Sequence, residues 1–120
     1  MKIHIYKFSY MYYIATHATD TFFKSLSDET RLLCLLLLVR RQSLCVCDFQ
    51  SMLQLSQPKI SRHLADLRNQ QLVEAERRGK WMYYRLHPAL PAWCLEVLTL
   101  AAQQDTSRLD RLINQLTCDC

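Results

Sequence analysis

The residues with the most distinctive chemistry are six cysteines, arranged as two Cys-x-Cys pairs and two single residues. Cys45 and Cys47 form the first pair, and Cys118 and Cys120 form the second at the end of the chain. Thiolates are soft ligands that select thiophilic metal and metalloid centres. Side chains at positions i and i+2 share one side of an extended chain but diverge on a helix. The first pair can therefore chelate one centre if its segment is extended.

The cysteines also allow readings without ligand chemistry. Free cysteine often packs as a small apolar side chain, and Cys34 and Cys94, within apolar helical stretches, are predicted to be core residues. Three disulfides would need an oxidising compartment. Residues 1–18 resemble a signal peptide only loosely, and no charge-free apolar stretch reaches 18 residues. We therefore expect a cytoplasmic protein with reduced thiols.

Positive charge is the second feature, and it is confined to one segment. The formal net charge is +4. Residues 56–87 hold seven basic and three acidic side chains, and the rest of the chain holds eight of each. A polyanion is the natural partner of such a segment, although a merely solubilising surface is the alternative.

The elements that must position these residues are mostly helical, because the chain has one glycine and three prolines. A first helix, capped by Thr19 or Asp20, is expected to run through Phe22, Phe23 and Leu26. A leucine-rich second helix, capped by Ser27 or Asp28 and ending at Arg40 and Arg41, is apolar nearly all round and should be central.

Two short helices with a tight link follow and predict a helix-turn-helix. Asp48 is expected to cap the first of them and Ser56 the second. The second helix turns an apolar face inward and presents side chains that read bases or contact phosphates, namely Gln57, Lys59, Ser61, Arg62 and His63. Asp66 on the same face is expected to pair with Arg62.

A β-hairpin is predicted next, because residues 73–76 and 81–86 alternate around a turn that holds Gly79. Arg78 and Lys80 at its tip would contact the DNA backbone or the minor groove. One last helix, from about Ala92 to about Leu116, is expected to pack against a partner subunit. The elements predict a mainly α protein with a small β-hairpin, a winged helix-turn-helix that dimerises through its first and last helices.

The predicted boundaries are an N-terminal extension at 1–17, the DNA-binding and dimerisation domain at 18–117, and a cysteine-containing tail at 118–120. Residues 1–10 depend on the choice of start, because Met11 is another candidate.

These segments together resemble the ArsR/SmtB family of winged-helix repressors, most of all its arsenic-responsive branch. The resemblance covers about residues 20–100, and its most specific stretches are residues 44–48 (LCVCD) and 56–64 (SQPKISRHL). It implies a homodimer that binds double-stranded operator DNA without ligand. It also implies release when trivalent arsenic or antimony, the inducer, binds the thiolates of Cys45 and Cys47. No catalytic cofactor is expected.

The sequence departs from the best-known arsenic pattern at the position of the third ligand, where that pattern has a cysteine and this chain has Gln50. Cys118 or Cys120 of either subunit is a candidate, and a two-sulfur site completed by water is the alternative. The zinc site on the last helix of related repressors is not expected, because no histidine follows His87.

Other functions fit parts of the pattern. A cadmium- or lead-responsive repressor and a thiol-redox-responsive repressor would share this fold. A protein-interaction module that has lost DNA binding belongs to another class. An enzyme is not expected, because no Ser-His-Asp order, glycine-rich phosphate loop or paired-carboxylate site is apparent.

Overall fold

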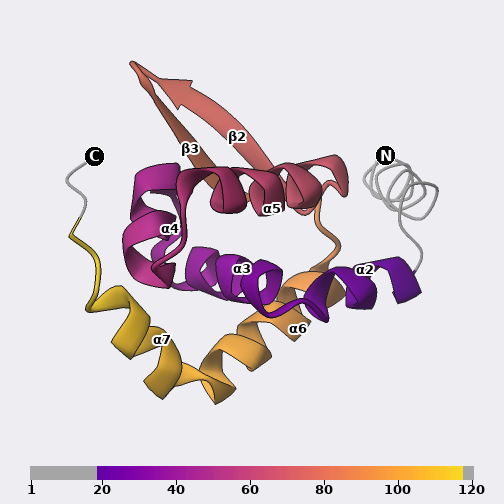
Figure 1. Ribbon diagram of the computed structural model, residues 1–120. Coiled ribbons are helices and arrows are strands. Elements are labelled where there is room, and N and C mark those ends of the chain that lie inside the picture. The colour runs from indigo at the N-terminus through magenta and orange to yellow at the C-terminus, as the bar shows by residue number, and fades with distance from the viewer. Residues whose placement is uncertain (1–18, 118–120) are drawn as a thin grey trace.

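The computed structural model describes residues 19–117, so the predicted extension at 1–17 and the tail at 118–120 lie outside the described residues. Figure 1 shows a mainly helical molecule with one small sheet, as the sequence predicts. The elements, in chain order, are α2 Thr19–Leu26, α3 Glu29–Arg41, β1 Leu44–Cys45, α4 Val46–Leu53, α5 Gln57–Asn69, β2 Val73–Arg78, β3 Trp81–Leu86, α6 Ala92–Gln104 and α7 Thr106–Ile113.

Helix α3 forms the centre of the molecule, as its apolar pattern predicts. Its residues 33–38 are all buried, and α5 and α6 pack on opposite sides of it (Figure 1). Asp28 caps the helix, because its carboxylate accepts the backbone N–H of Arg31 at 2.9 Å. Arg40 and Arg41 lie in the last turn, where cations are favoured by the helix dipole.

The sheet contains the predicted hairpin and one strand that the sequence does not predict. Strands β2 and β3 pair antiparallel around a turn at Gly79, whose φ of 64° glycine adopts without strain. Strand β1 adds to the other side of β3, with Cys45 opposite Tyr83. A strand of two residues is too short to show an alternating apolar pattern in the sequence.

The prediction of one long last helix is wrong, because the chain turns at Asp105 between α6 and α7. The hydroxyl of Thr106 donates to the carbonyl oxygen of Gln103 at 2.7 Å, and Arg108 binds the Asp105 carboxylate. Beyond the turn, α7 packs on α3 and α4, and Arg40 binds Asp110 at 2.6 Å. Leu109 is fully buried in this chain's own core. Leu109, in the second half of the predicted last helix, is thus a core residue.

Candidate DNA-binding face and thiol site

Helix α5 presents its polar face to solvent, with the basic side chains outward. Ser56 occupies the N-cap position, as predicted, and Ile60, Leu64 and Leu67 anchor the helix in the core. Of the predicted reading residues, Gln57, Lys59 and Arg62 are exposed. Ser61 is half-buried, and its hydroxyl accepts a hydrogen bond from the Gln57 amide at 2.6 Å. The N-terminal half of α5 therefore offers two cations and an amide to a ligand.

The prediction that His63 lies on the outer face of α5 is wrong. Its side chain is only 16% exposed, and Nδ1 lies 3.7 Å from the Asp28 carboxylate. That distance is too long for a hydrogen bond. His63 follows Ile60 by three residues, so it shares the inward side of the helix. No ion pair joins Arg62 to Asp66 among the described residues, and Asp66 lines a pocket beside α2.

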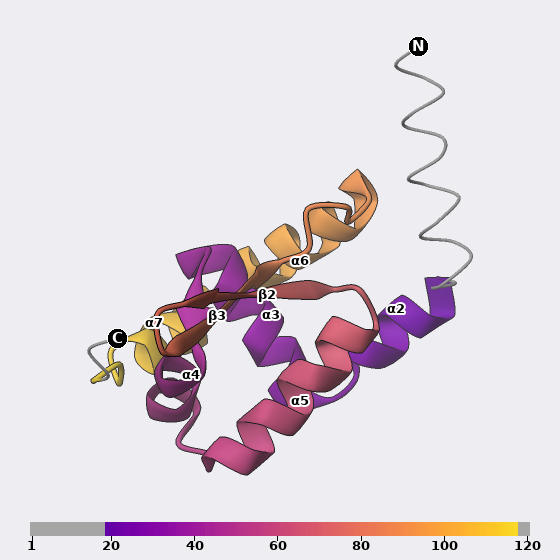
Figure 2. The ribbon, with the colours of Figure 1, turned by 90° about the horizontal axis from the view of Figure 1, so that it is seen from above.

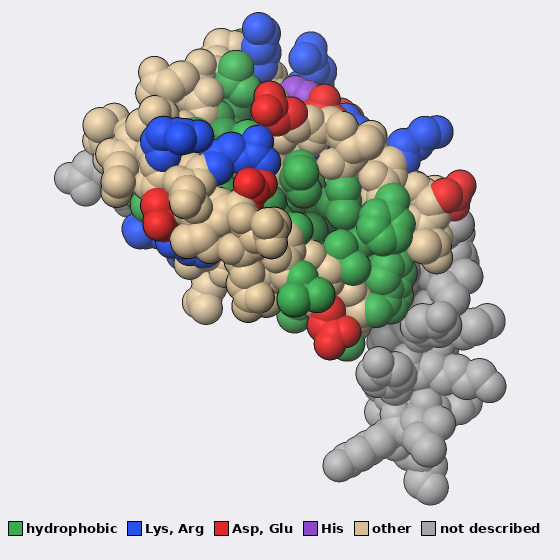
Figure 3. All heavy atoms as spheres, turned by 90° about the horizontal axis from the view of Figure 1, so that it is seen from below, with side chains coloured by type: hydrophobic (Ala, Val, Ile, Leu, Met, Phe, Trp, Pro, Cys, Tyr) green, Lys and Arg blue, Asp and Glu red, His purple; other side chains and the backbone are tan. Residues whose placement is uncertain are grey.

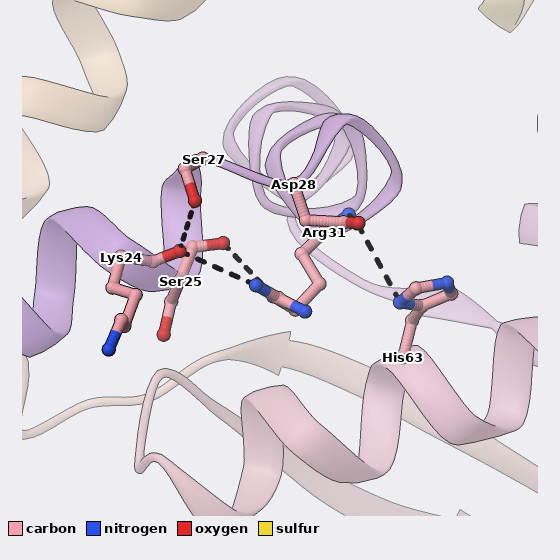
Figure 4. Close-up of polar contacts among 6 residues, drawn as sticks. All are labelled: Lys24, Ser25, Ser27, Asp28, Arg31 and His63. Atoms are coloured by element: carbon pink, nitrogen blue, oxygen red, sulfur yellow. Dashed lines mark hydrogen bonds and ion pairs between the residues drawn. The ribbon is translucent and has the colours of Figure 1, made fainter.

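His63 faces the corner where α2 meets α3 (Figure 4). The Arg31 side chain donates to the carbonyl oxygen of Ser25 at 3.1 Å, and the Ser27 hydroxyl donates to that of Lys24 at 2.7 Å. The backbone N–H of Arg31 lowers the pKa of the Asp28 carboxyl group. Helix α5 thus lies against a hydrogen-bonded corner in which the Asp28 carboxylate is the group next to His63.

The hairpin β2–β3 projects from the body on the side of α5, as Figure 1 shows, and Figure 2 shows it crossing above the helices. Arg78 binds Glu76 at 2.8 Å and lies over the ring of Tyr83, with 4.6 Å to its centroid. Lys80 is exposed at the tip, 6.0 Å from the centroid of the Trp81 ring. Both predicted tip residues therefore reach solvent on the side that carries α5.

The Cys45–Cys47 pair spans the junction between β1 and α4. Cys45 has extended backbone angles (φ −91°, ψ 167°) and is the N-cap of α4, and Cys47 lies in its first turn. The prediction that Asp48 is the N-cap is wrong by three residues. Its carboxylate instead accepts the backbone N–H of Cys45 at 2.9 Å, from the third helical position. Half of the pair is therefore extended and half is helical.

Sulfur chemistry separates the four described cysteines into two groups. Cys45 and Cys47 are each disulfide-bonded, so the prediction of reduced thiols is wrong for this pair, whereas Cys34 and Cys94 are not part of a disulfide. Cys34 and Cys94 are fully buried, which confirms them as core residues. Burial raises the pKa of the Cys34 thiol to about 12, and the charge of Asp28 adds to the effect. Within residues 19–117, no group of three or more His, Cys, Asp and Glu side chains is arranged to hold a metal ion.

A groove of about 420 Å³ opens beside Cys47 and is bordered by the segment that follows α7. The Ser51 hydroxyl accepts the backbone N–H of Thr117 at 3.0 Å and donates to the carbonyl oxygen of Gln115 at 3.5 Å. Leu116 packs on the core. Ser51 and this contact were not predicted, because neither sequence periodicity nor a motif indicates it.

A separate surface, over α2 and α6, is apolar. Phe23, Leu95 and Leu100 are 47%, 45% and 64% exposed. The ring of Trp93 lies 6.2 Å from that of Phe23 between centroids and joins the two helices. Figure 3 shows hydrophobic side chains gathered on this lower face. No described helix is long and apolar enough to cross a membrane.

Comparison with known proteins places the chain among bacterial regulators. Residues 28–75 match the family model described as bacterial regulatory protein, arsR family. The chain is 49% identical over 87 residues to an arsenic resistance transcriptional regulator of Pseudomonas putida, covering 72% of this chain and 76% of the relative. It is 45% identical over 94 residues to an arsenical resistance operon repressor of Escherichia coli, covering 78% and 80%.

Solved structures agree on the fold. The antimony-specific transcriptional repressor AntR superposes with a TM-score of 0.60 at 28% identity, covering 72% of this chain and 75% of that one. Reduced HlyU from Vibrio cholerae superposes with a TM-score of 0.61 at 29% identity, covering 68% and 82%. The chain is thus a DNA-binding transcription repressor with a winged helix-turn-helix, not an enzyme, and it belongs to the ArsR family of bacterial regulatory proteins.

Proposed function

We propose that this protein is a cytoplasmic homodimer that represses transcription from its operator and releases the DNA when trivalent arsenic or antimony binds Cys45 and Cys47. The observation that carries the proposal is the position of Cys45. It pairs with β3 of the hairpin and also begins α4, the helix that packs against α5. Cys45 is therefore paired directly with the hairpin and is linked to α5 through α4.

The DNA-binding part of the proposal is supported by exposure and charge. Lys59 and Arg62 on α5, and Arg78 and Lys80 on the hairpin, are exposed. The hairpin projects from the body on the side of α5 (Figure 1). Lysine and arginine read guanine in the major groove and bind phosphates, and Gln57 reads adenine. We keep Ser61 among the proposed DNA-binding residues, because its hydroxyl accepts a hydrogen bond from the Gln57 amide. His63 lies beside Asp28 and is mostly buried, so we do not place it among the residues that face the duplex.

The inducer part is supported by the chemistry and the backbone of the sulfur pair. Two thiolates attract a soft centre, and the positive end of the α4 dipole favours anionic ligands. Cys47 lies in the first helical turn, so chelation by both sulfurs requires that turn to unwind towards the extended form of Cys45. Unwinding would shift α4 and the strand that pairs with β3. The ligand then favours a state with weaker DNA affinity, which is what induction needs.

The homodimer is supported by the apolar surface over α2 and α6. Exposed apolar patches of this kind mark association sites. Because α7 folds back on its own core, the proposed interface is formed by α2 and α6, with Phe23, Leu95 and Leu100 as its apolar contacts.

The test is operator binding titrated with arsenite, antimonite, cadmium and zinc in a phosphine reductant. Wild type is expected to release the operator with arsenite or antimonite. Cys45→Ser and Cys47→Ser are expected to bind DNA as well as wild type and to need at least about 100-fold more arsenite, since two sulfur ligands form the minimal chelate. Cys94→Ala, which removes a buried thiol, is the control. Release of both serine variants at the wild-type arsenite concentration would reject this site.

A matched pair of variants tests the DNA face. Arg62→Ala is expected to weaken operator binding about tenfold and to reduce the salt slope by about one. His87→Ala, a change outside that face, should leave both unchanged. Equal affinity of wild type and Arg62→Ala would remove α5 from the interface.

A redox-responsive repressor is the second candidate, because Cys45 and Cys47 are both disulfide-bonded. In that case peroxide would release the operator and a phosphine reductant would restore binding. Release by peroxide alone, with no response to arsenite in the reduced protein, would favour this alternative.

A further inference from the structure

Helix α5, which carries most of the proposed DNA-binding residues, is held to the body by apolar packing and by one polar contact. Ile60, Leu64 and Leu67 are fully buried, and the helix packs on α3, α4 and β2. Among residues 19–117, the pair of His63 and Asp28 is the one hydrogen bond or ion pair that joins a side chain of α5 to another element. Because apolar packing is not directional, this pair is the contact that can fix the orientation of the helix.

The two partners face each other across the corner between α2 and α3 (Figure 4). Nδ1 of His63 lies 3.7 Å from Oδ2 of Asp28, and it is buried without a hydrogen-bond partner. A neutral imidazole gains little at this distance, which is too long for a hydrogen bond. An imidazolium gains a charge–charge attraction, which extends further. The strength of the contact therefore depends on the protonation of His63.

The charged groups of this corner leave the Asp28 carboxylate as the partner of an imidazolium. The backbone N–H of Arg31 lowers the pKa of Asp28, so this carboxyl group stays ionised at neutral and mildly acidic pH. The Arg31 side chain donates to two backbone carbonyl oxygens of α2. Asp66 lies three residues beyond His63 on α5, and it lines the pocket beside α2 together with Lys24 and Arg31.

The other elements that pack on α5 direct their acids elsewhere. Asp48, the one acid of α4, accepts the backbone N–H of Cys45. The two carboxylates of β2 pair with arginines of the hairpin, and Arg77 of the same strand is exposed. Among the described residues, Asp28 is therefore the one acid within ion-pair distance of His63.

The direction of His63 also sets the direction of its neighbour, Arg62. Successive residues of an α-helix lie about 100° apart around its axis. With His63 turned inward to Asp28, Arg62 is exposed to solvent. A rotation of α5 about its axis would break the first contact and move Arg62 relative to the hairpin that packs on the helix through β2.

We propose that His63 is a positioning residue for DNA binding, which in its protonated form pairs with Asp28 and fixes α5 in the orientation that binds the operator. Histidine ordinarily changes its charge between pH 5 and pH 8. As the pH falls through this range, the imidazole takes one proton from water, the attraction to Asp28 forms and operator affinity rises. The inference rests on the proposed DNA-binding face, and neither the sulfur pair nor an inducer takes part in it.

The experiment measures operator affinity at pH 8 and pH 6, at one salt concentration, in a phosphine reductant and without arsenite. Wild type is expected to bind about fivefold more tightly at pH 6, since the uptake of one proton changes an affinity by at most about tenfold per pH unit. His63→Gln, which has no proton to gain, should change by less than about twofold. His87→Ala, a change outside the DNA-binding face, should keep the wild-type dependence.

Asp28→Asn separates the pair from a general effect of the DNA charge on histidine. Asparagine caps a helix as well as aspartate does, so the start of α3 is kept while the charge beside His63 is removed. This variant should lose the pH dependence as His63→Gln does, and the double variant should behave like either single one. Urea unfolding at both pH values checks that each variant is folded.

Three outcomes would overturn the inference. The first is equal operator affinity of wild type at the two pH values. The second is a wild-type pH dependence in Asp28→Asn, because His63 would then respond to the phosphates and not to its partner. The third is a wild-type pH dependence in His63→Gln. Failure of the proposed DNA-binding face is a different result, in which Arg62→Ala binds the operator as tightly as wild type at both pH values.

Discussion

The chain holds two sets of described cysteines in different surroundings. Cys34 lies in the middle of α3 and Cys94 near the start of α6, and both are fully buried in the core and are not part of a disulfide. Cys45 and Cys47 lie where a strand becomes a helix, and both are disulfide-bonded. Cys45 is as fully buried as Cys34, so burial alone does not distinguish the two sets.

Backbone position makes the difference. A thiol inside a long helix surrounded by leucines has apolar neighbours, and its ionised form is disfavoured by burial, as the raised pKa of Cys34 shows. A thiol at a helix start lies near polar backbone groups and, at this start, near a groove. The chemistry open to a cysteine thus depends on whether it lies inside a helix or at the start of one, and a count of cysteines does not give this position.

The largest effect that tests this contrast is expected for Cys34→Ser. The hydroxyl would be fully buried, and a buried polar group without a partner costs about 1–3 kcal/mol in unfolding free energy. Urea unfolding of the reduced protein measures the loss. The arsenite concentration for operator release should change by less than about twofold, because the folded variant keeps the sulfur pair.

Cys34→Ala is the matched control, with a smaller loss because no polar group is introduced. A shift in arsenite response by either variant, in protein that is fully folded, would show that the core thiols take part in sensing and would erase the contrast.

The pH dependence of stability gives the next effect. The pKa of the Cys34 thiol is about 12 in the folded protein against an ordinary value of 9.0. Above pH 9 the unfolded chain loses this proton while the folded protein keeps it. The contribution of the Cys34 thiol to the free energy of unfolding is therefore complete below pH 9. It is lost as the pH rises towards 12, at about 1.4 kcal/mol per pH unit.

Urea unfolding at pH 8 and pH 10 measures this loss, with Cys34→Ala as the reference. Wild type should lose about 1.4 kcal/mol more than the variant between these values. Equal losses in the two proteins would mean that Cys34 ionises as readily in the fold as in the unfolded chain.

The sequence predicts most elements of the DNA-binding face because each has its own local signal. Ser56 before an apolar i, i+4, i+7 pattern indicates α5, and Gly79 between alternating segments indicates the hairpin. The inward direction of His63 is not predicted, because polarity suggests exposure while the helix period places it beside Ile60. Periodicity is the better guide at that position.

Features that depend on contacts between residues far apart in the chain are not predicted by local sequence patterns. The break at Asp105 depends on α7 reaching α3 and α4, including the bond of Arg40 to Asp110. Strand β1 exists because β3 offers a free edge. Helix α4 starts at Val46 because the Asp48 carboxylate accepts a hydrogen bond from the backbone N–H of Cys45, three residues earlier. This is a capping box. The Cys-Val-Cys-Asp order allows this geometry but does not require it.

The smallest effect concerns that hydrogen bond. Asp48→Ala removes the acceptor of the Cys45 N–H and should lower the unfolding free energy by about 1 kcal/mol. If both sulfurs bind one centre only after the first turn of α4 unwinds, the same change removes part of the cost of unwinding. Operator release should then occur at about fivefold lower arsenite, the equivalent of that energy.

Asp48→Asn, whose amide oxygen can still accept the bond, is the matched control and should lie between wild type and Asp48→Ala in both measurements. The stability loss and the arsenite shift should therefore rise together across the three proteins. A loss of stability with an unchanged or higher arsenite concentration would mean that the helical first turn of α4 binds the centre as it stands. The contrast between the two sets of cysteines would then rest on access through the groove alone.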